Sequence, residues 1–336
     1  MNKCWLSLVV LVCLPVTIRA GESTKVRQKL YVTNSAGNDV TVVDVATNKP
    51  IGKIEVGLHP HGIAVPASQD VILVTIEGTK PGELVWIDPN TDKVIKRMSI
   101  GPAPNQLAVT PDGKFAYVPV SDGHYEVIDL AKEKIIKRIF TGGRPHNTLC
   151  SADGKRMYLA PMGSPKKVTI VDVASHKPIG VIPFSNVVRP VALTTDEKRL
   201  FAEVDGLVGI EMADLAKHEL IRVPADLSPE NKTKASRSHG LGIRPDQKEI
   251  WECDVEHMEV HVYDITVPRP KQIATIPMGG RVYWLTFSPN GKYCYVSVRS
   301  RNETAVVDTA TKEIVARIPA GKEPKRLLVV TLKDKK

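Results

Sequence analysis

A short apolar strand that ends in aspartate recurs seven times along the chain, and this repeat limits the fold more than any other feature. The strand ends are Val43-Asp44, Ile87-Asp88, Ile128-Asp129, Val171-Asp172, Ala213-Asp214, Tyr263-Asp264 and Val307-Asp308. Successive aspartates are 44, 41, 43, 42, 50 and 44 residues apart. A period in the low forties is typical of a four-stranded propeller blade and fits neither a solenoid nor two unrelated domains. We therefore predict an all-β fold, a seven-bladed β-propeller with four antiparallel strands per blade.

The first repeat shows how the strands are encoded. β-branched and aromatic residues favour strands at 29–34, 39–45, 51–56 and 61–66. The carboxylate of Asp44 falls in the turn between the second and third of these strands, where it can accept backbone N–H hydrogen bonds. The aspartate series is thus expected to fix turns rather than to carry chemistry.

The two ends of the repeat region are out of phase. The repeat region starts with a strand of the KLYVTN type at Lys29, and it ends with a strand of the innermost type at 325–332. The last strand can therefore complete the blade that the first strand begins. Such a closed ring leaves no open sheet edge between the chain ends, which removes a site of aggregation.

The N-terminal twenty residues have the pattern of a secretory signal peptide. Lys3 supplies a positive charge, residues 6–14 form a short apolar run, and the segment ends in Ile18-Arg19-Ala20. The expected organisation is a signal peptide at 1–20, a linker at 21–28, a single propeller at 29–332 and a tail at 333–336. The apolar run is too short for a stable membrane anchor, so we expect no transmembrane anchor after cleavage and a periplasmic or secreted protein.

The predicted mature chain is basic. Loss of Lys3 and Arg19 lowers the formal charge from +9 to 46 − 2 − 37 = +7. This charge favours anionic partners such as nucleic acid, lipid head groups or acidic polysaccharide, but the basic residues are dispersed among acids, as on an ordinary solvated surface. We expect a monomer.

Leu30-Tyr31-Val32-Thr33-Asn34, the Val-Val-Asp that follows and the Pro-His-Gly-Ile-Ala-Val stretch from residue 60 resemble the YVTN-repeat β-propeller proteins. The resemblance covers residues 29–332. It implies a seven-bladed propeller, and it leaves the function open among surface-layer and periplasmic binding proteins, nucleic-acid binders and proteins encoded beside quinone-dependent dehydrogenases. Similar propellers include sugar lactonases and the large subunit of amine dehydrogenases, so the fold is a weak guide to function.

The residues that open the innermost strands of a propeller converge on one mouth of the central channel. When the repeats are aligned, this position holds His61, Asn105, His146, Val191, His239, Tyr283 and Lys325. Two residues earlier, four consecutive repeats carry Arg144, Arg189, Arg237 and Arg281. Loops on the same side add acids, of which Glu77 and Glu203 join the predicted site. Clustered arginines would bind a small anion, unless carboxylates pair with them to tie neighbouring blades together.

The histidines at the mouth raise a second interpretation of the same site. His61, His146 and His239 are ligand types that suit zinc, copper or iron, and a ring could gather them however far apart they are in sequence. The metal prediction is a divalent ion on these three residues, and the alternative is that each ring bonds a neighbouring carbonyl group.

No nucleophile elbow, phosphate-binding glycine loop or zinc-protease helix motif occurs in the sequence. The leading hypothesis is an exported binding or scaffold protein whose channel mouth takes a small anionic ligand, a metal or a protein partner. One alternative is an enzyme, either a lactonase or lyase with a histidine base or an accessory subunit of an exported quinone-dependent dehydrogenase. Another alternative is single-stranded nucleic-acid binding. Three interpretations of the insertion at 224–237 stay open: a lid over the mouth, a contact with a partner, or a polar loop that the fold tolerates.

Overall fold

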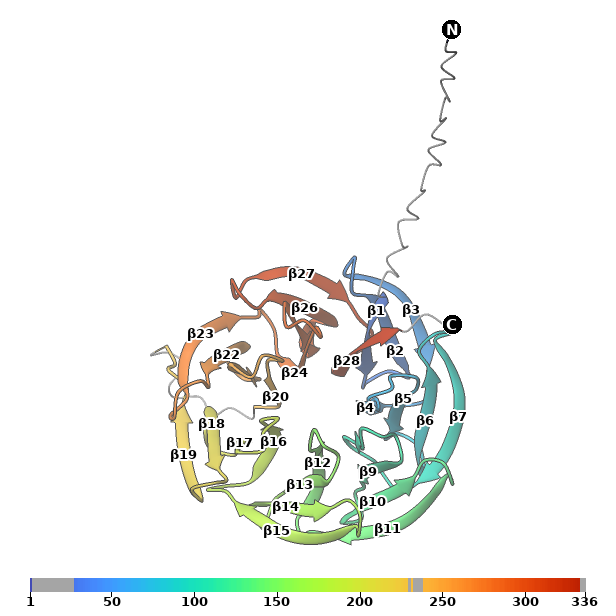
Figure 1. Cartoon of the computed structure of the whole chain (residues 1–336), viewed down its shortest axis with the longest axis horizontal. Helices are drawn as coiled ribbons and strands as arrows, with labels where there is room; N and C mark the ends of the chain where they lie inside the picture. The colour runs from blue at the N-terminus through green and yellow to red at the C-terminus, as the bar shows by residue number, and fades with distance from the viewer. Residues whose placement is uncertain (2–26, 229–230, 232–237, 333–336) are drawn as a thin grey trace.

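The computed structural model describes residue 1 and residues 27–228, 231 and 238–332. Within these ranges the chain forms seven four-stranded sheets arranged in a ring around a central channel (Figure 1). All pairings within the sheets are antiparallel. The predicted seven-bladed β-propeller is confirmed.

Blades are numbered here in chain order, and each is given from its inner to its outer strand. Blade 1 consists of β28 (Pro324–Leu332), β1 (Arg27–Asn34), β2 (Asp39–Asp44) and β3 (Lys49–Glu55). Blade 2 consists of β4 (Pro60–Ala64), β5 (Ile72–Ile76), β6 (Gly82–Asp88) and β7 (Lys93–Ile100). Blade 3 consists of β8 (Ala108–Val109), β9 (Phe115–Pro119), β10 (His124–Asp129) and β11 (Lys134–Phe140). Blade 4 consists of β12 (Arg144–Cys150), β13 (Arg156–Met162), β14 (Lys167–Asp172) and β15 (Lys177–Pro183).

The remaining blades follow the same plan. Blade 5 consists of β16 (Val188–Leu193), β17 (Arg199–Val204), β18 (Gly209–Asp214) and β19 (Glu219–Pro224). Blade 6 consists of β20 (Gly240–Ile243), β21 (Glu249–Asp254), β22 (Glu259–Asp264) and β23 (Lys271–Pro277). Blade 7 consists of β24 (Val282–Phe287), β25 (Tyr293–Val298), β26 (Glu303–Asp308) and β27 (Ile314–Pro319), with the short 3-10 helix η1 (Arg299–Arg301) after β25.

The ring closes as predicted, because the last strand pairs with the first. Leu30 lies opposite Val329 and Val32 lies opposite Leu327 in the β1–β28 ladder. Leu30, Val32 and Leu327 are all buried in one core cluster with side chains of blade 7. The first and last described strands thus share one blade, in which β28 lies beside β1 (Figure 1).

The recurring aspartates fix turns, as predicted. The Asp44 carboxylate accepts the Ala46 N–H at 2.9 Å, and Asp308 accepts the Ala310 N–H at 2.9 Å. These bonds hold the tight connection between the third and fourth strands of a blade.

Side-chain hydroxyl groups tie the inner strands of three consecutive blades to one another. Ser297 accepts the Trp284 N–H of its own blade at 3.0 Å and donates to the Lys325 carbonyl group of blade 1 at 2.7 Å. Thr33 accepts the Arg326 N–H and bonds the His61 carbonyl group of blade 2, both at 3.1 Å.

Thr75 repeats the bridge one blade further along the ring. Its hydroxyl group accepts the Gly62 N–H at 2.8 Å and donates to the Asn105 carbonyl group of blade 3 at 2.7 Å. Each bridge satisfies the backbone of two inner strands where they begin, so it fixes the mouth of the channel. This bonding compensates buried backbone groups that would be costly to leave unpaired.

We expect Thr33→Val to lower the free energy of unfolding by about 1–3 kcal/mol, because valine keeps the shape of threonine but leaves buried N–H and C=O groups without a partner. Urea unfolding of the two proteins measures this difference. Thr47→Val is the matched control, since the Thr47 hydroxyl bonds Asp44 in an exposed turn. Equal losses for the two variants would show that the bridge does not stabilise the ring.

Candidate functional site

The hydrogen-bond register shows which residues open each inner strand. In four blades and at the β1–β28 pair, a bulge precedes the equivalent ladder pairs at Ile63, Thr148, Val191, Leu285 and Leu327. The residue that opens each inner strand, here called its first-level residue, lies two residues earlier. In the other two blades it is the residue whose N–H donates to the end of the second strand. The first-level residues are Lys325, His61, Asn105, His146, Arg189, His239 and Tyr283.

This register agrees with the sequence alignment except in blade 5. His146 lies at the first level of blade 4, and Asn147 is the residue level with Arg326 and Trp284. In blade 5 Val191 lies two positions after the first level, and Arg189 takes the place that the alignment gave to Val191. The repeats differ in loop length before the inner strand, so counting residues between motifs moved this blade out of phase.

His61 is held by a carboxylate. The side chain is 3% exposed, and its Nδ1 lies 2.6 Å from Glu77 Oε2. Because a carboxylate only accepts, Nδ1 carries the proton and Nε2 has a free lone pair. Nε2 is buried and has no hydrogen-bond partner. Burial, followed by the charges of Lys325 and Arg326, holds the pKa of His61 well below its usual range, so the ring is neutral.

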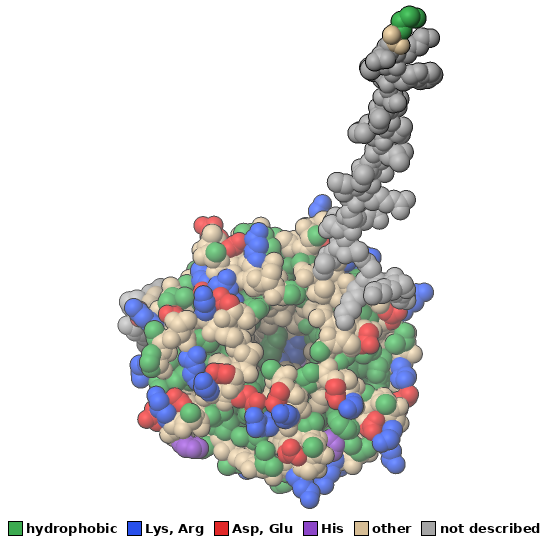
Figure 2. All heavy atoms as spheres, in the orientation of Figure 1, with side chains coloured by type: hydrophobic (Ala, Val, Ile, Leu, Met, Phe, Trp, Pro, Cys, Tyr) green, Lys and Arg blue, Asp and Glu red, His purple; other side chains and the backbone are tan. Residues whose placement is uncertain are grey.

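Arg326 is a buried cation on the inner strand β28. It is 2% exposed, and its guanidinium group lies 3.8 Å from the ring centroid of Trp284. One Nη donates across the channel to Asn147 Oδ1 in blade 4 at 3.4 Å, while Nε and the other Nη have no partner. Burial lowers its pKa to about 10. Figure 2 shows lysine or arginine atoms inside the central hollow.

Two further histidines meet in the same space. Asn147 Nδ2 donates to His146 Nδ1 at 2.7 Å, and the His146 and His239 rings stand edge to face with centroids 5.8 Å apart. The His239 ring lies 4.4 Å from that of Tyr283, which is 7% exposed. Burial is the main cause that lowers the pKa of His146, and the charges of His239 and Arg326 add to it.

The three predicted metal ligands lie near one another, but their described side chains do not form a metal-ligand arrangement. Across the described ranges, no group of three or more His, Cys, Asp or Glu side chains is placed to hold a metal ion. His61 and His146 each use Nδ1 for a side-chain partner, Glu77 and Asn147 respectively.

The predicted arginine rim is divided between paired and unpaired groups. Arg189 forms an ion pair with Asp205, and Arg281 lies 3.5 Å from Glu256 of the neighbouring blade. Arg144 is exposed on the rim. Arg237 lies outside the described residues. The two pairs remove part of the positive charge that the sequence suggested, so the rim itself is a weaker anion site than four free arginines would be.

Glu203 is not at the mouth surface but between blades 5 and 6. It is 1% exposed, and neither carboxyl oxygen has a hydrogen-bond partner. Burial, and then the nearby Glu252 and Asp254 carboxylates, raise its pKa well above the usual range. Glu203 occupies in blade 5 the place that Thr33, Thr75 and Ser297 hold in their blades.

A cavity of about 320 Å³ opens beside the ring of first-level residues. Its walls include His239, Tyr283, Arg281 and Arg299. Arg299 is paired with Glu323 on the opposite wall, with Nε to Oε2 at 2.9 Å. Asn105 completes the far side of the mouth, with its Nδ2 3.4 Å from His61 Nδ1.

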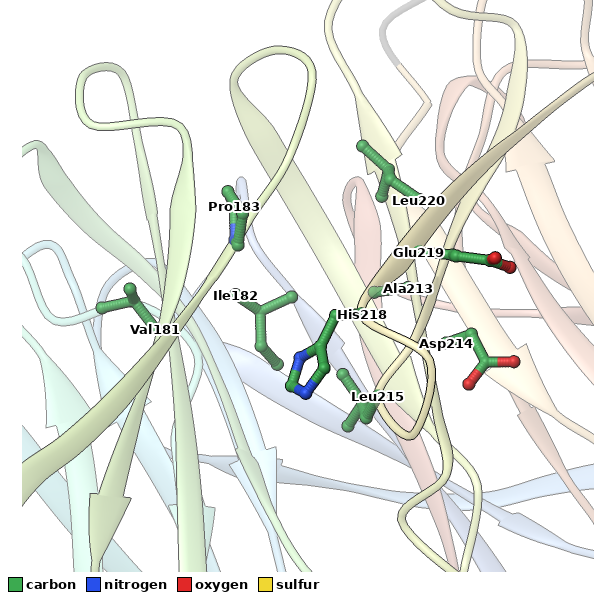
Figure 3. Close-up of a pocket in the computed structure, with 9 residues that line it drawn as sticks. All are labelled: Val181, Ile182, Pro183, Ala213, Asp214, Leu215, His218, Glu219 and Leu220. Carbon is green, nitrogen blue, oxygen red and sulfur yellow. The ribbon is translucent and has the colours of Figure 1, made fainter.

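A second hollow of about 230 Å³ lies on the perimeter between β15 and the turn before β19. Figure 3 shows His218 and Leu215 pointing toward Ile182, while the Asp214 and Glu219 carboxylates point away. None of its lining side chains has a buried polar atom without a partner, within the part of the chain that is described. This hollow therefore lacks the buried, unpartnered nitrogen atoms that His61 and Arg326 provide at the mouth.

Sequence reasoning missed the two cations at the centre of the site, Lys325 and Arg326, together with Arg299. Lys325 was in the alignment of the repeats but not among the predicted site residues, and Arg326, the next residue of the closing strand, was not considered. The sequence feature that could have indicated both is a pair of basic residues in the otherwise mostly apolar strand Pro324–Leu332. Of the insertion, residues 229–230 and 232–237 lie outside the described ranges, and the Asn231 carbonyl group lies 3.0 Å from His257 Nε2.

A family model described as YNCE-like beta-propeller matches residues 12–335. That description carries no YVTN-repeat label, so the narrower assignment stays a prediction. No curated protein sequence matches the chain. Within the described residues, no helix has the length and apolar character needed to cross a bilayer.

Several solved structures share the fold. Hydrazine synthase of Kuenenia stuttgartiensis is 22% identical, with a TM-score of 0.73 over 84% of this chain and 92% of that one. The periplasmic gluconolactonase PpgL of Pseudomonas aeruginosa is 15% identical, with a TM-score of 0.75 over 90% and 99%. A protein from Lactobacillus plantarum is 14% identical, with a TM-score of 0.77 over 92% and 100%. At these identities the likeness shows the fold alone.

Proposed function

The chain belongs to the YNCE-like β-propeller family, and we propose that its channel mouth binds a small organic anion. The observation that carries this proposal is the buried Arg326 guanidinium group, which has two unpartnered nitrogens and no carboxylate partner among the described residues. A guanidinium group presents a planar fork of donors that suits a carboxylate.

Burial of an unpaired charge is costly, and an isolated cation in a protein interior is normally neutralised or paired. Stacking on Trp284 and one long bond to Asn147 compensate only part of that cost. Two acids of the mouth are already used, because Glu77 bonds His61 and Glu323 bonds Arg299. An anion that enters the mouth would complete the hydrogen bonding of Arg326 without displacing a protein group.

The surroundings restrict the ligand to a small molecule. The neighbouring cavity holds about 320 Å³, and its Tyr283 and His239 rings offer flat apolar faces. A carboxylate with a short polar body fits these walls better than an extended polymer does. The proposal therefore retains the binding function expected from the sequence and moves its anchor from the rim to Arg326.

We expect Arg326→Met to weaken the binding of a carboxylate by about 10- to 100-fold, which corresponds to the roughly 1.5–3 kcal/mol of a hydrogen bond to a charged group. Isothermal titration calorimetry with pyruvate, gluconate and inorganic phosphate measures this and separates carboxylate from phosphate preference. Arg156→Met is the matched control, since Arg156 is bonded to Glu197 at the opposite end of the second strand. Wild-type protein that binds none of the three anions, or an Arg326→Met variant that binds them equally well, would refute the proposal.

A second candidate is lactone hydrolysis, and the Glu77–His61 pair favours it. His61 Nε2 is free to take a proton from water, the resulting hydroxide would attack the lactone carbonyl carbon, and Arg326 would stabilise the oxyanion. Collapse of that intermediate breaks the ring C–O bond, and the leaving alkoxide regains the proton from His61. PpgL, named a gluconolactonase, has the same fold, which supports the candidate by analogy only.

If this candidate is right, wild-type protein hydrolyses glucono-1,5-lactone above the buffer rate, and His61→Asn lowers kcat/KM by about 10²- to 10⁴-fold. Because the pKa of His61 is depressed, the base form persists as pH falls, so the rate should stay flat well below pH 6.5. A pH-stat assay measures both effects, with His218→Asn on the perimeter as control. A rate equal to that of buffer alone would eliminate this candidate and leave anion binding untouched.

Export remains part of the proposal. The pattern in residues 1–20, which lie almost entirely outside the described ranges, supports a cleaved signal, and the similar PpgL is named periplasmic. We expect the mature chain to begin at Gly21. Intact-mass measurement of protein recovered from the periplasm or medium checks this, and an uncleaved chain confined to the cytoplasm would contradict it.

A further inference from the structure

We infer that Lys325 is a carbonyl-reactive amine that forms an imine with 2-oxo acids bound at the channel mouth. The inference rests on the proposed anion site and deepens it, because it selects anions whose carboxylate is adjacent to a ketone or aldehyde carbon. Lys325 would supply the nucleophile, Arg326 the carboxylate partner and His61 the proton acceptor.

The Lys325 amine occupies an unusual position for a lysine. It lies at the first level of β28, half-buried, with Nζ 5.3 Å from the ring centroid of Tyr283. Two other lysines whose side chains are shielded from solvent reach carboxylates, Lys29 with Asp92 at 2.6 Å and Lys312 with Glu249 at 2.7 Å. Lys325 forms no ion pair with any carboxylate of the described residues.

The surroundings of Lys325 favour the neutral amine. Burial is the largest cause, and the positive charges of Arg299 and Arg326 add to it against the opposing effect of Glu77, which together lower the pKa of Lys325 to about 8. About a tenth of the amine is then neutral at pH 7, whereas an ordinary lysine is almost fully protonated. Desolvation beside another cation is a known way to activate a lysine for attack on carbonyl carbon.

The placement of Arg326 explains a preference for 2-oxo acids over simple ketones. Lys325 and Arg326 lie over the consecutive rings of Tyr283 and Trp284. Both charges also act on His61, where they are the two largest electrostatic causes of its lowered pKa. The amine and the guanidinium group therefore face one shared space, and a 2-oxo acid offers each of them a matching group on adjacent carbons.

Access and backbone position complete the geometry. Tyr283 is a wall of the 320 Å³ cavity, so a small molecule in that cavity reaches the ring that Lys325 covers. The Lys325 carbonyl group is fixed by Ser297 at 2.7 Å, which holds the start of the strand in place. Because the backbone of Lys325 is fixed, only its side chain has to be ordered when the amine reacts, and this reduces the entropy lost.

The reaction balances without an outside oxidant or reductant. The lone pair of neutral Nζ attacks the carbonyl carbon, a C–N bond forms, and the carbonyl π electrons move to oxygen. His61 Nε2 accepts the proton released from nitrogen and delivers it to that oxygen. A second proton, taken from solvent and relayed by His61 Nε2, then protonates the carbinolamine hydroxyl group, which leaves as water as the C–O bond breaks and the C=N bond forms, giving a protonated imine on Lys325.

Reductive trapping tests this inference on the full mature protein. Pyruvate and sodium cyanoborohydride should give one reduced pyruvate adduct per chain, and peptide mapping by mass spectrometry should place it on Lys325. Trapping in the wild type should rise with pH with a midpoint near 8, as the pKa requires. Lys325→Arg should abolish the adduct, whereas Lys312→Arg, the matched control at an ion-paired lysine, should retain it.

Companion measurements separate this inference from the proposed anion site. Arg326→Met should reduce the trapping rate of pyruvate at least tenfold while changing that of acetone, which has no carboxylate, less than threefold. Calorimetric binding of pyruvate without an adduct, an adduct on other lysines, or a midpoint above pH 10 would overturn the role of Lys325 and leave anion binding intact. Absence of both binding and adduct would overturn both proposals. The pH titration needs no variant, so the test does not depend on whether Lys325→Arg folds.

Discussion

Hydrogen bonds from three hydroxyl groups, those of Ser297, Thr33 and Thr75, are the interaction on which the site depends. Each hydroxyl group joins the inner strand of its own blade to the first-level carbonyl group of the next blade. The bridged carbonyl groups belong to Lys325, His61 and Asn105, which are neighbours around the mouth. The contacts that close the ring therefore also set the positions of the side chains that face the channel.

Burial has opposite effects on the groups that these strands present. Desolvation keeps His61 neutral and lowers the pKa of Lys325, while Arg326, with its much higher intrinsic pKa, stays charged. The mouth thus combines a base, an amine that is partly neutral and a permanent cation within one small space. In water, both the lysine and the arginine would be protonated cations at neutral pH, and the lysine would not be a nucleophile.

The sequence was sufficient to predict the fold because blade number, turn aspartates and ring closure all follow from local periodicity. It also selected His61, His146 and Tyr283 for the channel mouth, since these side chains lie close to motifs that repeat. In blade 5 it placed Val191 where Arg189 lies, and it omitted Arg326, because both positions are next to a bulge in the β-ladder. A bulge leaves no clear mark in composition, and a shift of one residue moves a side chain to the other face of a strand.

The closing strand β28 has two roles that cannot be separated. Its apolar residues, such as Leu327, seal blade 1 against blade 7, and its first residues carry Lys325 and Arg326 into the channel. These two cations lie more than 290 residues from Thr33, which bonds the Arg326 backbone. Before the ring closes, both side chains are in water, where the amine is protonated and the guanidinium group is fully hydrated. The chemistry proposed for the mouth therefore arises from ring closure itself, since only the closed propeller removes water from Lys325 and places Arg326 across the channel.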